Sequence, residues 1–158
     1  MEQWVYPYVY KNMQRITYTG ATFDLFHSGH VNFLRQCRLI TGDGKLIVSL
    51  NTDEFIIEYK GKPPVMSYKE REKVLRSCRY VDDVIPNVGG KDSRIAIEQV
   101  KPQFIIIGSD WAKKDYYRQM SFTQEWLDER NIVLCYVPYT ENISTTDIKR
   151  RVACATHA

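Results

Sequence analysis

Short apolar runs alternate with longer amphipathic segments along most of the chain, and each kind of pattern predicts its own secondary structure. The apolar runs predict strands at residues 15–19, 45–50, 81–85, 104–107 and 132–137. The amphipathic segments predict helices at about residues 30–40, 67–78, 93–100, 122–130 and 145–152. Strands separated by helices of this length indicate an α/β fold, with a parallel sheet and helices on both faces.

Local signals mark several ends of these elements. Ser67 and Glu70 have the spacing of a capping box, the residues Thr-Gly-Asp-Gly at 41–44 end the first helix, and Pro86 closes the third strand. In parallel sheets of this kind, ligands bind beyond the carboxyl ends of the strands. We therefore expect the chemistry to follow the ends of four predicted strands. These ends are Thr19, Leu50, Ile107 and Val137.

The chain has 158 residues, which is enough for one domain with a proper core. We expect an extension at residues 1–14, a single domain at 15–153 and a tail at 154–158. The extension is rich in aromatic side chains, which we expect to pack on their own domain or on a partner chain. These side chains are Trp4, Tyr6, Tyr8 and Tyr10.

Composition and charge narrow the classes of partner. The net charge of +3 fits an anionic small molecule, and without a long Lys/Arg run we expect no nucleic acid partner. No apolar run approaches the roughly 20 residues of a membrane span, and residues 1–11 lack the apolar core of a signal peptide. Four scattered cysteines, at positions 37, 78, 135 and 154, indicate a reducing, cytoplasmic compartment.

The strongest chemical signal is the segment Thr-Gly-Ala-Thr-Phe-Asp-Leu-Phe-His-Ser-Gly-His at residues 19–30. Two histidines three positions apart, His27 and His30, can face one point at the start of a helix, where backbone N–H groups and the helix dipole favour phosphate. Gly29 leaves room for the close approach of a ligand. A structural histidine pair is one alternative, and Asp24 keeps a metal site open as another.

This segment resembles the signature of the cytidylyltransferase family, Gly-x-Phe-Asp-x-x-His-x-Gly-His, with Thr22 as an additional residue before Phe23. The likeness continues in "NTDE", "KGKPPVMSYKER", "CRYVDDVIP", "IIGSDW" and "ENISTTDIKRR", and covers about residues 15–152 in order. The family includes glycerol-3-phosphate, phosphocholine and phosphoethanolamine cytidylyltransferases. The resemblance implies a Rossmann-like sheet, the HxGH nucleotidyltransferase architecture, and phosphate binding by His27 and His30.

The glycine-containing loop that follows carries two lysines, Lys60 and Lys62. A lysine on such a loop can bring an ammonium onto a phosphate, although loop lysines are more often solvated. The resemblance implies that a lysine here approaches the phosphates of both substrates, and we expect this to be Lys60 before Lys62. Arg71 and Arg79 would by themselves be surface charges, and the resemblance implies a nucleotide or dimer contact for Arg79.

Two later motifs follow apolar strands. Asp110 and Trp111 could accept from a base amine and wall off the base, or could form an ordinary turn, and the resemblance favours nucleotide binding. At residues 139–146, three consecutive hydroxyls could cap a helix or bind terminal phosphates. The family pattern has arginine where Tyr139 stands and glycine where Asn142 stands, and Asn can adopt the left-handed conformation of a glycine. Four cations could replace that arginine: Lys113, Lys114, Arg118 and Lys149.

The resemblance thus implies an enzyme that transfers CMP from CTP to a small phosphorylated alcohol, most simply glycerol 3-phosphate, and releases pyrophosphate. Mg²⁺ would accompany the triphosphate, without a dedicated protein metal site, and the chain would form a homodimer. The alternatives are an ATP-dependent relative acting on flavin mononucleotide or a sugar phosphate, and a nucleotide-binding protein without turnover. The expected catalytic residues are His27, His30 and Lys60. The expected acceptor-binding residues are Asp24, Lys60 and Lys62. The expected nucleotide-binding residues are Thr19, Gly20, Ala21, Thr22, Phe23, Arg79, Asp110, Trp111, Tyr139, Ser144, Thr145 and Thr146.

Overall fold

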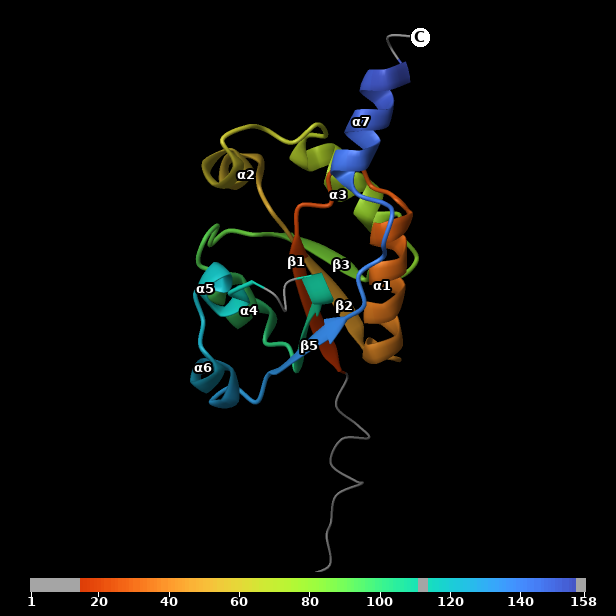
Figure 1. Ribbon diagram of the computed structural model, residues 1–158. Coiled ribbons are helices and arrows are strands. Elements are labelled where there is room, and N and C mark those ends of the chain that lie inside the picture. Colours follow the sequence, from red (N-terminus) through yellow and green to blue (C-terminus); the bar gives the residue numbers. More distant parts are fainter. Residues whose placement is uncertain (1–14, 111–113, 156–158) are drawn as a thin grey trace, which may run out of the picture.

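The computed structural model describes residues 15–110 and 114–155, and it centres on one parallel sheet (Figure 1). The five strands lie side by side in the order β3-β2-β1-β4-β5. Every neighbouring pair is parallel. The strands are β1 (Ile16–Ala21), β2 (Lys45–Leu50), β3 (Asp83–Pro86), β4 (Phe104–Gly108) and β5 (Val133–Val137). The α/β fold predicted from the alternation of strands and helices is confirmed.

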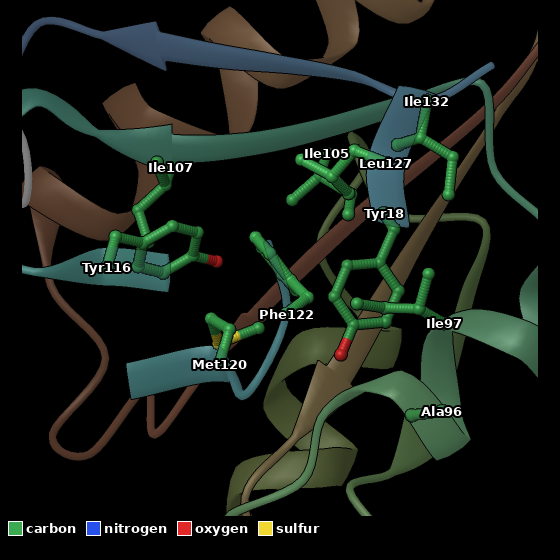
Figure 2. Close-up of a cluster of buried hydrophobic side chains, with 10 residues drawn as sticks. All are labelled: Tyr18, Ala96, Ile97, Ile105, Ile107, Tyr116, Met120, Phe122, Leu127 and Ile132. Carbon is green, nitrogen blue, oxygen red and sulfur yellow. The ribbon is translucent and has the colours of Figure 1, made fainter. Parts of the chain in front are cut away.

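Helices cover both faces of the sheet, and residues on β4 alternate between the two buried clusters that result. Ile106 packs in the cluster that includes side chains of α1 and α3, whereas Ile105 and Ile107 pack in the cluster that includes side chains of α4, α5 and α6 (Figure 2). The run of isoleucines is therefore buried on both faces, as parallel sheets require. The helices are α1 (Ser28–Thr41), α2 (Asp53–Lys60), α3 (Tyr68–Arg76), α4 (Arg94–Val100), α5 (Tyr116–Met120), α6 (Gln124–Asp128) and α7 (Thr145–Ala155).

All five predicted strands and five predicted helices are present, with ends that differ by a few residues. The pattern did not predict α2, although its local signals are complete. Thr52 caps it by accepting from the N–H of Phe55, Asp53 opens its first turn, and Gly61 ends it with φ 70°. The five-residue α5 was also not predicted, because one turn is too short for a periodic pattern.

The order of the strands places a topological switch point between β1 and β4. From β1 the chain first builds outward through β2 and β3, and then returns to the other side of β1 to add β4 and β5. The carboxyl ends of β1 and β4 therefore diverge into connections on opposite sides, which leaves a crevice between them. At the same end of the sheet, α7 projects away from the body and buries no residue (Figure 1). Among the described residues, no helix is long and apolar enough to cross a membrane.

Candidate active site

The two histidines at the start of α1 form a reciprocal capping box, with His27 as the N-cap residue and His30 as the third residue of the helix. His27 is the N-cap residue, and its Nδ1 accepts a hydrogen bond from the N–H of Gly29 at 3.1 Å. In return, His30 Nδ1 accepts from the N–H of His27 at 3.4 Å. The two rings are stacked, with centroids 3.8 Å apart. The structural role that was one alternative for this pair is therefore real, and it leaves the Nε2 atoms for other partners.

These hydrogen bonds determine where the protons lie on the two rings. Because each Nδ1 accepts, a neutral ring must carry its proton on Nε2. Burial lowers the pKa of His27. Burial, together with the neighbouring His27, lowers the pKa of His30 to about 3, against the opposing effect of Asp24. At neutral pH the site thus holds two uncharged imidazoles, each with an Nε2–H that can donate to an oxyanion.

Gly29 is required by the packing of the protein itself. A Cβ atom at this position would lie 2.9 Å from Cε1 of His27 and 3.0 Å from Cγ2 of Ile143. From the sequence we expected this space to admit an approaching ligand. In the structure, the His27 ring and the Ile143 side chain occupy it.

A cavity of about 580 Å³ opens at the carboxyl ends of the strands beside the switch point. Its walls come from the loop after β1, from α2 and the loop that follows it, and from the first turns of α7. The structure therefore brings together most of the predicted site. The predicted residues in its wall are Gly20, Ala21, Thr22, Phe23, Asp24, His30, Lys60, Lys62, Thr145 and Thr146. Further lining residues that the sequence analysis did not single out as site residues include Asn51, Phe55, Tyr59, Asn87, Tyr116 and Gln119.

Asp24 is buried and holds two other segments to the loop after β1. Its carboxylate accepts from the backbone N–H groups of Val65 at 3.0 Å and Met66 at 2.9 Å. Lys149 of α7 lies 3.6 Å from the same carboxylate. Burial by itself would raise the pKa of Asp24, but the two backbone hydrogen bonds, Lys149 and Arg71 outweigh it and lower the pKa. Asp24 is therefore ionised at neutral pH, and both of its oxygens already have partners.

Positive charge gathers around this carboxylate. Lys60, Lys62, Lys149 and Lys114 all line the cavity. Burial lowers the pKa of Lys60, Asp24 opposes that change, and the nearby Lys149, Lys62 and Arg71 lower it further. Of the four cations considered as replacements for an arginine at position 139, Lys114 and Lys149 line the cavity, Arg118 does not, and Lys113 lies outside the described residues.

Arg71 is fully buried, which corrects its interpretation as a charge on a helix surface. Its guanidinium donates to the backbone carbonyls of Thr22 at 2.7 Å, Asn51 at 3.0 Å and Met66 at 3.0 Å. It also pairs with the carboxylate of Asp53 at 2.6 Å. One side chain therefore ties together the loop after β1, the end of β2, the start of α2 and the loop before α3. Thr22, Asn51 and Asp53 are distant from Arg71 in the sequence, so local periodicity carried no sign of this role.

Other predicted residues lie outside the cavity wall. Thr19 is buried within β1, His27 stacks against His30, and Arg79 is exposed beyond the end of α3. A carboxylate oxygen of Asp110 lies 4.0 Å from Nζ of Lys114. Trp111 lies outside the described residues.

The segment before α7 borders a neighbouring hollow that Tyr139 and Ser144 line together with Asn142. Ser144 accepts from the N–H of Asp147 at 3.0 Å, which is the capping role that was one alternative for it. Asn142 has φ 62°, so it does adopt the left-handed conformation of a glycine. Tyr139 is half exposed, and its hydroxyl donates to the carbonyl of Ile143 at 3.5 Å.

A parallel sheet with a switch-point cavity that four lysines and His30 line defines an α/β protein whose site suits phosphate groups. The chain belongs to the cytidylyltransferase-like family, whose model matches residues 18–151. It is an enzyme of the nucleotidyltransferase class, as the sequence resemblance implied.

Similar proteins differ in the substrates that their names state. The chain is 37% identical over 136 residues to the glycerol-3-phosphate cytidylyltransferase of Bacillus subtilis (strain 168), covering 85% of this chain and 95% of that protein. It is 41% identical over 91 residues to the FAD synthase of Pyrococcus horikoshii, covering 58% and 60%. A lipopolysaccharide core biosynthesis protein from Thermoplasma volcanium shares the fold, with a TM-score of 0.64, 22% identity, and coverage of 82% and 98%.

Proposed function

We propose that this protein transfers CMP from CTP to a small phosphorylated alcohol, most simply glycerol 3-phosphate, and releases pyrophosphate. The observation that carries the proposal is that one cavity is lined both by neutral His30, whose donor is Nε2–H, and by a group of lysines. The similarity to glycerol-3-phosphate cytidylyltransferase over most of both chains supports the choice of substrates.

The reaction needs no covalent enzyme intermediate and no general base. An oxygen of the acceptor's ionised phosphate attacks the α-phosphorus of CTP, and the bond from that phosphorus to the bridging oxygen of the pyrophosphate breaks in line. Catalysis is then positioning and charge stabilisation. His30, with His27 stacked behind it, would donate to the α-phosphate as its charge grows. Lys60 would contact both donor and acceptor phosphates, and Thr146 with the first N–H groups of α7 would hold the leaving pyrophosphate.

We also propose that Mg²⁺ arrives with the triphosphate. Within residues 15–110 and 114–155, no three His, Cys, Asp or Glu side chains are grouped so that they could hold a metal ion. Mg²⁺ often keeps several waters and binds through substrate phosphates, so this arrangement fits its chemistry. When bound, the ion would neutralise part of the triphosphate charge.

The charges in the cavity support an acceptor that is the phosphate of an uncharged polyol over one that is a phosphorylated amino alcohol. Among the described residues that line the cavity, Asp24 is the one carboxylate, and both of its oxygens already have partners. An ammonium group on the acceptor would meet four lysines and no free carboxylate, which is costly in a partly desolvated site. Hydroxyl groups could instead use neutral side chains such as Asn51 and Gln119.

The similarity to FAD synthase keeps one alternative, an enzyme that joins ATP to flavin mononucleotide. A screen of CTP and ATP against glycerol 3-phosphate, phosphoethanolamine and flavin mononucleotide, with pyrophosphate release as the readout, separates the candidates. We expect turnover with CTP and glycerol 3-phosphate, and little with phosphoethanolamine. Turnover with ATP and flavin mononucleotide would favour the alternative. Nucleotide binding without pyrophosphate release for any acceptor would indicate a binding protein.

The four cysteines are free thiols, which supports the proposal of a reducing, cytoplasmic location. Measuring the distribution of the tagged chain among cell fractions tests this location directly. Recovery from an oxidising compartment would contradict it.

A further inference from the structure

A second hollow of about 1130 Å³ lies at the other end of the sheet from the active site. The amino ends of three strands frame it: Arg15 precedes β1, Phe104 begins β4 and Val133 begins β5. Ile97 of α4 and Ile132 belong to the same wall. We call this hollow the amino-end groove. It shares no lining residue with the active-site cavity.

The amino-end groove exposes apolar surface beside an unpaired strand edge. Within residues 15–110 and 114–155, β5 is the last strand of the sheet and pairs with β4 alone. Val133 at its start is 51% exposed, and Tyr136 further along is 41% exposed. Proteins usually cover or charge such an edge, because its unpaired backbone N–H and C=O groups and the exposed apolar side chains beside them attract other chains. We therefore expect another segment or chain to cover this groove.

The chain carries a segment of matching chemistry immediately before Arg15 in the sequence. Arg15, in the groove wall, is preceded by residues 1–14, which lie outside the described residues and before the family match that starts at residue 18. Fourteen extended residues reach about 46 Å, which is ample to follow a groove that begins at their own end. Aromatic residues stand at every second position, so an extended chain presents all of their rings on one face. These residues are Trp4, Tyr6, Tyr8 and Tyr10.

The rim of the groove offers partners for those rings. Arg15 and Lys101 are exposed there, and the guanidinium of Arg15 already lies 5.4 Å from the centre of the Phe104 ring. Cations at this distance attract the faces of aromatic rings. Pro7, in the middle of the aromatic run, suits an extended chain that needs no continuous ladder of backbone hydrogen bonds.

We propose that residues 4–10 bind in the amino-end groove of their own chain, with the aromatic rings against Phe104, Ile132 and Val133. The tether favours this arrangement over binding to a second copy, because Arg15 holds the segment at the groove at a high effective concentration. The segment would then cover the apolar edge at the pole of the sheet that the active site does not use. The proposal is independent of which substrates the enzyme takes.

Fluorine NMR of the full chain labelled with 5-fluorotryptophan tests this directly. The chain has three tryptophans, so Trp4→Phe assigns the resonance of Trp4. We expect that resonance to differ from its position in the denatured chain, and to return to that position in Val133→Glu. The matched control is Val88→Glu, since Val88 is a 54% exposed side chain that follows β3 at the carboxyl end of the sheet, opposite the groove, and this change should leave the Trp4 resonance in place.

A Trp4 resonance already at the denatured position in the wild-type chain would overturn the proposal. A shift that grows with protein concentration between 1 and 100 µM would also overturn it, because the segment would then bind another copy. If Val133→Glu fails to fold, hydrogen exchange replaces it. The variant with Trp4, Tyr6, Tyr8 and Tyr10 changed to serine leaves the groove intact and should exchange at least about fivefold faster at the amides of residues 131–134. Unchanged exchange there would refute docking.

Discussion

At the scale of single residues, the histidine pair serves the fold and the chemistry through different atoms. The Nδ1 atoms of His27 and His30 accept backbone hydrogen bonds that cap α1. The Nε2–H groups are the ones that would donate hydrogen bonds to a phosphate. This division suggests a substitution that separates the two roles, because the side-chain oxygen of asparagine lies near the place of Nδ1 and nothing replaces Nε2.

We predict that His30→Asn keeps the fold and loses turnover. The amide oxygen can still accept from His27, so the free energy of unfolding should change by less than about 1 kcal/mol. The loss of a transition-state donor should reduce kcat at least about 100-fold, or about 2.7 kcal/mol. Pyrophosphate release and chemical unfolding measure the two effects. A variant that retained more than about a tenth of the wild-type rate would show that His30 is not a principal donor.

The low pKa of His30 predicts a dependence of stability on pH. An unfolded histidine takes up a proton near pH 6.5, whereas folded His30 resists it down to about pH 3. The unfolded state therefore binds more protons in this window, so the contribution of His30 is complete above pH 6.5 and is lost as the pH falls towards 3. Urea unfolding between pH 6.5 and 4.5 should show a steeper loss for wild type than for His30→Asn, by at most about 1.4 kcal/mol per pH unit. Equal slopes would contradict the buried, neutral histidine.

At the scale of secondary-structure elements, the site depends on how separate segments are held to each other. Asp24 binds the loop before α3 and pairs with Lys149 of α7, and the Thr145 hydroxyl donates to the carbonyl of Asp24 at 2.8 Å. Arg71 binds four segments at once. Because α7 buries no residue of its own, these polar contacts near its first turns place it beside the cavity.

We predict that Arg71→Met destabilises the protein by at least about 3 kcal/mol. The change leaves the carbonyls of Thr22, Asn51 and Met66 without their buried donor and removes the partner of Asp53. Urea unfolding followed by fluorescence measures the loss. Arg35→Met is the matched control, since Arg35 is exposed on α1 and its substitution should stay within about 0.5 kcal/mol. Similar small effects for both variants would refute the central role of Arg71.

At the scale of the whole molecule, the order of the strands separates two ends with different tasks. The carboxyl end of the sheet holds the cavity and its lysines, and the amino end holds the amino-end groove. Arg79 follows the end of α3 and is exposed, so a second copy of the chain could contact it.

We predict that the protein is a homodimer in solution, as symmetric pairs are the commonest assemblies of soluble proteins. Light scattering at micromolar concentration should give about twice the chain mass of 18.6 kDa. Arg79→Glu should shift the mass towards that of one chain, whereas Arg35→Glu should not. An active wild-type protein with the mass of one chain under assay conditions would show that the interface hypothesis is wrong.

The sequence by itself determined the alternation of strands and helices, because periodicity and turn residues are local signals. It also identified the turn at 19–30 that carries the histidine pair, and Asn142 indicated a left-handed position that glycine would otherwise occupy. The signals for α2 were local as well, at Thr52 and Gly61, and could have predicted that helix.

Only the tertiary structure decided which of these residues meet. Arg71 is a buried hub because its partners at Thr22, Asn51 and Asp53 come together through strand order, which no local pattern encodes. Gly29 must be small because Ile143, more than a hundred residues away, packs against it together with the neighbouring His27 ring. Contacts between distant segments depend on the packed fold. Local patterns could therefore indicate which residues carry the chemistry, but not which of them lie together.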